Sequence, residues 1–334
     1  MLNSWWRHDK GRMLSSLLAC ASLGLLPWSA ARPQSDHFPG KAITVIVPVA
    51  AGATATQIRV LGSCMSTALG GASVVIENKP GAGGAIGTAT VKNAKPDGYT
   101  LLFIATPVIS VVPHLTPATY TLSDFAPIGN LSGTPMLMAA RQDAPFKTFE
   151  ELLKYARSNP NAINFASGGV GTSMHLTGVE LQAVADLEFT HVPFQGGAPA
   201  LNAVISGVAD VIIAPPSLLT PMIEAGRLRP LVLFGDTRYK RYPGVPTAHE
   251  SGVDVVENLR SGLLAPRDVP KPVLARLETA FRSALVDPRC IGALEKADID
   301  IDYLNAAQFE QDLQQQVARY NRLFANPKFS SHVQ

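Results

Sequence analysis

Short apolar runs alternate along the chain with segments in which apolar residues recur every three or four positions. Runs rich in Val, Ile and Leu predict strands, and the periodic segments predict helices. The predicted strands are residues 43–47, 73–77, 100–104, 188–192, 211–214, 231–234 and 262–265. The predicted helices are residues 52–69, 81–92, 149–158, 173–185, 198–206, 218–225 and 273–285. Because strands separated by helices of this length form parallel sheets covered on both faces, the pattern predicts an α/β fold.

The N-terminal segment has the pattern of a cleavable export signal. Basic residues precede an almost wholly apolar run at 13–26, and small residues at 29–31 provide the site that a signal peptidase reads. We place cleavage after Ala31, so that residues 1–31 are the signal peptide. A membrane-spanning anchor is disfavoured because the run is shorter than the roughly twenty residues that a spanning helix needs. A lipoprotein beginning at Cys20 is disfavoured because the apolar run continues beyond it.

Composition and charge exclude two classes of partner. Hydrophobic residues make up 46% of the 334 residues, enough for a sizeable core, and the length predicts about two domains. The 28 basic and 26 acidic residues are interspersed. Removal of residues 1–31 takes away three basic residues and one acidic residue, which leaves 25 of each. This balance does not predict binding to nucleic acid or to an anionic membrane.

Two cysteines remain after removal of the signal: Cys64 in a predicted helix and Cys290 near the C-terminal end. An oxidising compartment would allow them to form a disulfide. Two buried thiols are the alternative, because pairing depends on geometry that the spacing does not give. Both alternatives stay open at this stage.

Four glycine-containing corners lie where predicted strands meet predicted helices. Glycine lets the backbone approach a ligand closely, and the first N–H groups of a helix attract anions because they lack intrahelical partners. Any single corner is better explained as a tight turn with a helix cap, but four in one chain favour an anion-binding pocket. The corners are residues 51–54, 80–84, 167–173 and 195–197.

Other chemistries find little support in the sequence. The corner at 80–84 resembles a dinucleotide-binding motif, but residues intervene between it and its strand, and no acid follows at the spacing that holds a ribose. Ser173 and His175 lack the sequence pattern of a nucleophilic serine, and the histidines lack metal-binding spacing. Asp298 and Asp300 are interpreted as part of a solvated face. We therefore expect no enzymatic activity, no cofactor and no metal.

The ordered motifs of the mature chain resemble the Bug-type substrate-binding proteins of tripartite tricarboxylate transporters. The resemblance covers roughly residues 38–325, and its specific elements are Pro-Gly-Ala-Gly-Gly at 80–84 and Pro-Asp-Gly-Tyr-Thr at 96–100. The further matching segments are residues 38–41, 47–48, 75–79, 124–128, 171–178, 191–196, 207–210, 226–229, 244–247 and 262–266.

This resemblance implies a two-domain clamshell of the type II periplasmic binding-protein kind, in which each domain is a mostly parallel sheet flanked by helices. Domain 1 is expected at residues 38–137 plus 262–334, and domain 2 at residues 138–261. The chain would cross twice between them. The resemblance also implies that the ligand lies in the cleft between the domains, where backbone N–H groups, hydroxyl groups and ordered water hold its carboxylate.

Candidate ligand-binding residues come from the corners and from the resemblance. They are Ala51, Gly52, Thr54, Thr56, Thr106, Gly171, Thr172, Ser173, His175, Gln195, Gly196 and Arg260. Thr56 stands where many relatives have an acid, which argues against an amino-acid ligand. Arg260 stands where relatives often carry an aromatic pair. It either faces the cleft and pairs with a carboxylate, or lies on the surface at the hinge.

These observations predict a periplasmic solute-binding protein that captures a small organic acid and passes it, as a monomer, to the membrane components of a tripartite tricarboxylate transporter. The alternative is a ligand-sensing periplasmic protein that presents its bound form to a signalling receptor. Both would use the same residues. Neighbouring genes for a large and a small membrane component would favour transport.

Overall fold

The computed structural model describes residues 38–50, 53–297, 299–330 and 333, so the predicted signal peptide lies outside the described residues. The strands are β1 (Ile43–Val47), β2 (Val74–Asn78), β3 (Thr100–Ala105), β4 (Phe125–Pro135), β5 (Leu137–Arg141), β6 (Asn164–Ser167), β7 (Thr190–Pro193), β8 (Val211–Ala214), β9 (Leu228–Leu233), β10 (Asn258–Pro266) and β11 (Ile301–Asn305).

Helices connect and cover these strands. They are α1 (Ala53–Ala68), α2 (Ala85–Lys92), α3 (Pro107–Ser110), α4 (Val112–Leu115), α5 (Phe149–Ser158), α6 (Ser173–Ala185), α7 (Gly197–Ile205), α8 (Pro216–Glu224), α9 (Lys271–Ala284), α10 (Pro288–Lys296), α11 (Ala306–Ala325) and α12 (Pro327–Ser330), with short 3₁₀ helices η2 (Ala82–Gly84) and η3 (Leu122–Asp124). The predicted α/β class is confirmed.

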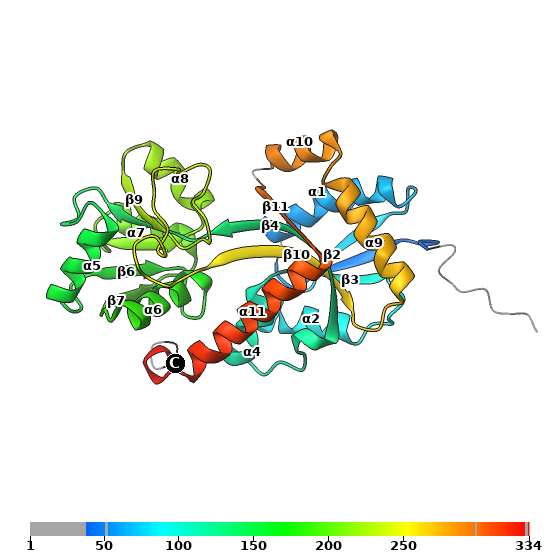
Figure 1. Ribbon diagram of the computed structural model, residues 1–334, viewed down its shortest axis with the longest axis horizontal. Coiled ribbons are helices and arrows are strands. Elements are labelled where there is room, and N and C mark those ends of the chain that lie inside the picture. Colours follow the sequence, from blue (N-terminus) through cyan, green and yellow to red (C-terminus); the bar gives the residue numbers. More distant parts are fainter. Residues whose placement is uncertain (1–37, 51–52, 298, 331–332, 334) are drawn as a thin grey trace, which may run out of the picture.

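The strands form two sheets, each at the centre of one lobe (Figure 1). The first lobe has the strand order β11-β4-β10-β3-β1-β2, and the second lobe has the order β7-β6-β8-β5-β9. Within each sheet one group of three strands is parallel, β1 to β3 in the first and β6 to β8 in the second. Both sheets are mixed, because β10, β11 and β5 run antiparallel to their neighbours.

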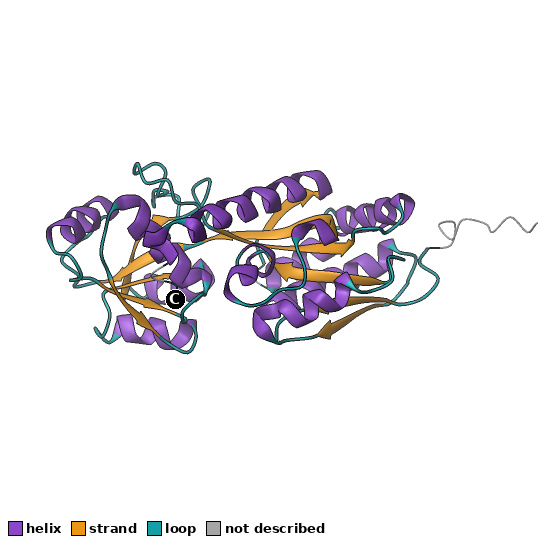
Figure 2. Cartoon of the chain, turned by 90° about the horizontal axis from the view of Figure 1, so that it is seen from below, coloured by secondary structure: helices purple, strands orange, loops and turns teal. Residues whose placement is uncertain are grey.

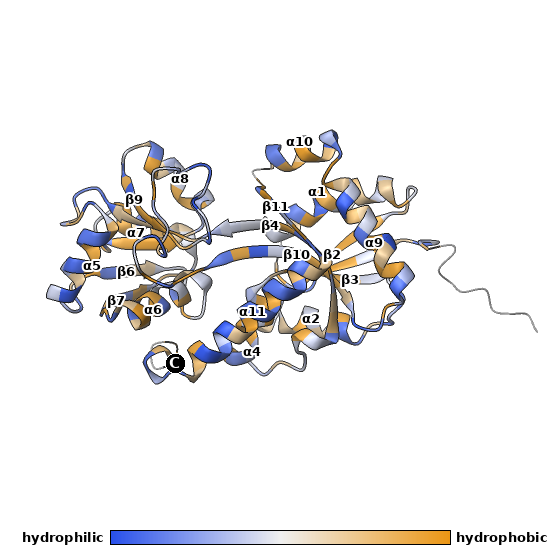
Figure 3. Ribbon diagram, in the orientation of Figure 1, coloured by the Kyte–Doolittle hydropathy of each residue, from blue (hydrophilic) through white to orange (hydrophobic). Residues whose placement is uncertain are grey.

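The central strands β1 and β3 of the first sheet are buried on both faces, which explains their almost uninterrupted apolar sequences. Along β3, Leu101 and Phe103 join one core cluster, and Leu102 and Ile104 join another. Successive side chains of a strand point to opposite faces, so each face receives every second residue. Helices cover both faces of the sheets in Figure 2, and apolar residues concentrate on the strands in Figure 3. Burial of this kind is the main source of stability for the lobe.

Two extended segments link the lobes. The chain leaves the first sheet at Pro135 and enters the second at Leu137, with one residue between them. It returns through the segment after β9, and β10 begins at Asn258. Figure 1 shows β4 and β10 crossing side by side between the lobes, and their antiparallel pairing holds them together. Two adjacent crossings therefore connect the lobes.

Helix α11 makes a third connection between the lobes. Its first half packs against the first sheet through Phe309 and Leu313. Its second half joins α12 in an apolar cluster that includes Leu176 and Val179 of α6, which belongs to the second lobe. Figure 1 shows α11 running from the first lobe to the side of α6. The C-terminal segment therefore spans both lobes.

A disulfide ties α1 to α10. Cys64 and Cys290 are bonded, with 5.8 Å between their Cα atoms and a sequence separation of 226. The choice between a disulfide and two thiols, which the sequence leaves open, is therefore settled in favour of the disulfide. Among the helices of the described residues, none has the length and apolar character needed to cross a membrane.

Candidate functional site

A cavity of about 490 Å³ lies between the two lobes. Its volume falls within the range that is usual for small-molecule sites. The first lobe contributes Thr54, Thr56, Gln57, Ala105, Ala297, Ile299 and Asp300. The crossing strands contribute Thr134, Leu259 and Ser261. The second lobe contributes Pro215, Pro216, Ser217, Thr220, Pro221, Glu224, Tyr239 and Arg241. We call this space the interlobe cavity.

Two helices begin at the interlobe cavity, one from each lobe. Thr54, Thr56 and Gln57 belong to the first five residues of α1, and Ser217 is the second residue of α8. The first N–H groups of a helix lack intrahelical acceptors, and the helix dipole adds partial positive charge at this end. The cavity is therefore suited to an anion, although the described side chains that line it include one cation, Arg241.

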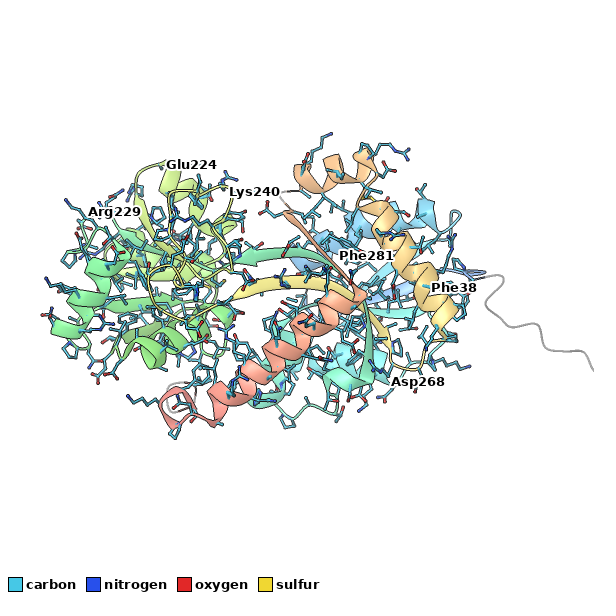
Figure 4. All side chains as sticks on the ribbon, in the orientation of Figure 1. Phe38, Glu224, Arg229, Lys240, Asp268 and Phe281 are labelled. Carbon is cyan, nitrogen blue, oxygen red and sulfur yellow. A yellow bond between two sulfur atoms is a disulfide. The ribbon has the colours of Figure 1, made fainter. Side chains whose placement is uncertain are left out.

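Each charged side chain of the cavity forms an ion pair or a hydrogen bond with another residue of the cavity wall. Arg241 Nη2 lies 3.1 Å from Glu224 Oε1, and both residues line the second-lobe wall. The hydroxyl group of Tyr239 donates a hydrogen bond to Asp300 Oδ2 and so connects the second lobe to the first. Glu224 is labelled near the top of the second lobe in Figure 4. Asp300 is exposed, as its interpretation as part of a solvated face predicts, and folding also brings it to the edge of the cavity, whereas Asp298 lies outside the described residues.

Arg260 lies on the other face of β10. Leu259 and Ser261 face the interlobe cavity, so the alternation of a strand turns Arg260 away from it. Its guanidinium group is buried and binds three carboxylates: Nε to Asp312 Oδ1 at 2.9 Å, Nη1 to Asp302, and Nη2 to Asp236 at 3.7 Å. Arg260 thus does not line the interlobe cavity and is not a surface arginine; it lines a separate pocket on the other face of β10. It joins β10 to β11, α11 and the segment after β9.

The corner between β6 and α6 is closed by its own hydrogen bonds. The Thr172 hydroxyl accepts from the backbone N–H of His175 at 3.4 Å and donates to the carbonyl of Gly169 at 2.7 Å. Gly171 has a φ of 78°, a left-handed conformation that favours glycine. A Cβ at Gly171 would meet Leu115 of α4 at 2.8 Å, so the corner packs against the first lobe. Thr172 therefore serves as the N-cap of α6.

Two stacked histidines support this corner from inside the second lobe. The rings of His175 and His191 lie 4.1 Å apart. His191 Nε2 is 2.7 Å from the hydroxyl oxygen of Ser167, and His175 Nδ1 accepts a hydrogen bond from the N–H of Gly171 at 3.2 Å. Burial lowers the pKa of His191. The unprotonated form of His175 Nδ1 is the form that can accept from Gly171.

The second-lobe corners adjoin each other. The N–H of Gly196 donates to the carbonyl of Gly168 at 3.2 Å, and Gly196 has a φ of 112°. Gln195 is exposed beside it. Thr106, just after β3, is fully buried, its N–H donates to the carbonyl of Arg260 at 2.9 Å, and its hydroxyl has no hydrogen-bond partner among the described residues. None of these predicted residues lines the interlobe cavity.

The structure therefore divides the predicted site residues. Thr54 and Thr56 line the interlobe cavity. Ala51 and Gly52 lie outside the described residues. The following predicted residues do not line it: Thr106, Gly171, Thr172, Ser173, His175, Gln195, Gly196 and Arg260.

Sequence reasoning missed the start of α8. Pro215 and Pro216 follow the buried strand β8 directly, so this is a further corner between a strand and a helix, but it contains no glycine. The signal that could have found it is a proline at the first helical position, because proline there begins a helix. Ala297, Ile299 and Asp300 could not be found in this way, since they reach the cavity only through the packing of α10 on α1.

Within the described part of the chain, no group of three or more His, Cys, Asp or Glu side chains is placed to hold a metal ion. The polar atoms that line the cavity are mostly hydroxyl and amide groups. Such an arrangement binds a small polar molecule by hydrogen bonds.

Known proteins are similar to this chain over nearly its whole length. A family model described as the tripartite tricarboxylate transporter family receptor matches residues 57–327. The UPF0065 protein in the gbd 5' region of Cupriavidus necator is 34% identical over 295 residues, which cover 88% of this chain and 89% of the relative.

Solved structures of solute-binding proteins share the fold. A TctC solute-binding protein from Polaromonas, solved with no ligand, gives a TM-score of 0.80 at 28% identity and covers 86% of this chain and 99% of its own. MatC from Rhodopseudomonas palustris, with bound malate, gives a TM-score of 0.66 at 29% identity and covers 85% of this chain and 99% of its own. The predicted clamshell architecture is confirmed by these similarities. Since the family model spans most of the sequence, the chain belongs to the tripartite tricarboxylate transporter receptor family.

Proposed function

We propose that the chain is a periplasmic solute receptor that binds a small organic acid in the interlobe cavity and delivers it to the membrane components of a tripartite tricarboxylate transporter. The observation that carries this proposal is the cavity itself, whose walls come from both lobes and include the starts of α1 and α8. Helix N-termini attract carboxylates. The hydroxyl groups of Thr54, Ser217 and Ser261 add donors at the same place. The malate bound to the related MatC agrees with this ligand class.

A thermal-shift experiment tests the binding step. A panel of mono-, di- and tricarboxylic acids is added to the purified protein at millimolar concentration. An acid present at a hundred times its Kd should raise the melting temperature by about 5 °C, because it binds only the folded state. A panel in which no acid raises the melting temperature would contradict the proposal.

A matched pair of variants locates the binding step in the cavity. Ser217 is exposed on the second-lobe wall, and Ser217→Trp would place a large side chain in the cavity without disturbing the core. This variant should keep the melting temperature of the free protein and lose the shift caused by the acid. Ser158→Trp, at the exposed end of α5 in the same lobe, should keep both. A full shift in Ser217→Trp would place the ligand elsewhere.

Binding between two hinged lobes should bring them together around the acid. Small-angle scattering should therefore give a smaller radius of gyration after addition of the acid. An unchanged radius would argue against closure.

We also infer that the protein is exported and that its mature form begins at Arg32, after cleavage of residues 1–31. The basic and apolar N-terminal pattern and the membership of the receptor family support this inference. Mass spectrometry of a periplasmic extract should find Arg32 as the first residue.

Deletion of the gene should abolish uptake of the bound acid, whereas a purely sensory protein would leave uptake intact.

A further inference from the structure

The side-chain amide of Gln57 has an unmet hydrogen-bonding group at the interlobe cavity. Gln57 is the fifth residue of α1, and its side chain lines the cavity. Its Oε1 atom is buried and accepts no hydrogen bond from any of the described residues. Buried polar atoms in native proteins nearly always have a partner. An ordered water or a donor group of a ligand in the cavity can supply that partner.

The missing partner of Oε1 is a hydrogen-bond donor. Carboxylate oxygens only accept hydrogen bonds, so the carboxylate of an acid does not satisfy this atom. A hydroxyl group or an ammonium group does. Because helical side chains lean toward the N-terminus of their helix, the amide of Gln57 extends toward the first turn of α1, where the proposed carboxylate would lie. The donor would therefore be near the carboxylate of the same ligand.

The charges of the cavity favour a hydroxyl group over an ammonium group. An ammonium group in a cavity requires a carboxylate partner. The carboxylates that line the cavity in the described structure are Glu224 and Asp300, and both are engaged, with Arg241 and Tyr239 respectively. A neutral hydroxyl needs only the amide oxygen.

We propose that Gln57 determines the specificity of the interlobe cavity, and that its Oε1 accepts a hydrogen bond from a hydroxyl group of the bound acid. The ligand class is then a hydroxycarboxylate. This inference rests on the proposed function, since it assumes that the cavity holds an organic acid.

Pairs of acids that differ by one hydroxyl group test this assignment. Calorimetric titration of the purified protein would compare malate with succinate, citrate with tricarballylate, lactate with propionate and mandelate with phenylacetate. In at least one pair the hydroxy acid should bind about tenfold or more tightly than its partner, because the unhydroxylated acid leaves Oε1 without a donor. The variant Gln57→Leu should reduce this ratio to below about threefold, mainly by weakening the hydroxy acid.

A control variant on the same helix separates specificity from helix stability. Ser63 is exposed on α1, away from the cavity, and Ser63→Ala should leave the ratio unchanged. If the wild type binds acids with no preference within any pair, or if Gln57→Leu keeps the preference, the role of Gln57 is wrong while the proposed function stands. Equal loss of both acids in Gln57→Leu would place the amide N–H against the carboxylate, which also contradicts the proposal. If the wild type binds none of the eight acids, the proposed function fails and this inference fails with it.

Discussion

Arg319 of α11 forms an ion pair with Glu180 of α6 and so joins the C-terminal helix to the second lobe. Its Nε atom lies 2.9 Å from Glu180 Oε1, and its Nη1 atom lies 3.1 Å from Oε2 of Glu257, just before β10. The hydroxyl group of Tyr320 donates to the same oxygen of Glu257 at 2.8 Å. Glu180 and Glu257 are buried, and their charges raise the pKa of Arg319 against the effect of its own burial. The cluster lies where the lobes meet, so it stabilises their relative position.

Replacement of Arg319 by leucine should strongly destabilise the protein. The change leaves two buried carboxylates without their shared cation, and loss of one partner of a buried ion pair costs about 3–5 kcal/mol. Urea denaturation would measure this loss of unfolding free energy. The same substitution at Arg289, which is exposed and pairs with Asp287 on the surface, should cause no measurable change. Equal stability of the two variants would contradict a structural role for the cluster.

Glu257 should make stability depend on pH. Burial raises its pKa although Arg319 lowers it, and Oε1 finds no donor among the described residues. A raised pKa in the folded state means that its stabilising contribution is complete below about pH 4.3, the ordinary glutamate pKa, and is lost as the pH rises through the raised pKa. Glutamine does not titrate, so Glu257→Gln removes this loss. The unfolding free energy of the variant minus that of the wild type should therefore increase with pH.

Urea midpoints of Glu257→Gln and wild type between pH 5 and 8 would check this trend. The exposed residue Glu295 of α10 provides the control, since Glu295→Gln should give a difference that stays constant over the same range. A constant difference for Glu257→Gln as well would mean that Glu257 is ionised in the folded protein throughout. In that case Arg319 would fully offset the effect of burial on the pKa of Glu257.

Local sequence patterns predicted the elements whose own residues form a clear apolar run or a clear helical period. The strands at Ile43–Val47 and Val211–Ala214 and the helix at Ser173–Ala185 have the predicted bounds, because an apolar run or a capped periodic segment defines each of them. The elements that were not predicted have weaker patterns. Strand β4 contains proline and glycine, and α11 has only three fully buried residues along its length. Their structure depends on distant partners.

The site was less predictable than the fold, for a similar reason. Glycine corners indicate where the backbone can turn, and Thr54 beside one of them does line the cavity. The face on which Arg260 lies depends on the register of β10, which the pairing with β3 and β4 decides. The contact between Tyr239 and Asp300 depends on how the two lobes are placed. Neither relationship is encoded within a single segment.

Loss of the disulfide should weaken both the fold and the cavity. The double variant Cys64→Ser with Cys290→Ser should lower the unfolding free energy by about 2–5 kcal/mol, because the disulfide closes a long loop. Helix α10 leads directly into Ala297 and Asp300, so the affinity for the acid should fall as well. Dithiothreitol should bring the wild type to the stability of the double variant and leave the double variant unchanged. Wild type and double variant of equal stability would contradict this expectation.

Thr54 and Thr172 should respond in opposite ways to removal of their hydroxyl groups. Thr172 caps α6 and hydrogen-bonds within its own corner, so Thr172→Ala should lower the unfolding free energy by about 1 kcal/mol and change acid affinity little. Thr54 lines the interlobe cavity, so Thr54→Ala should leave stability nearly unchanged and weaken acid binding by about 1–3 kcal/mol. Denaturant melts and calorimetric titration on both variants would separate the two roles, and Thr172→Ser should restore the cap. A large loss of affinity in Thr172→Ala at wild-type stability would show instead that this corner contacts the ligand after the lobes close.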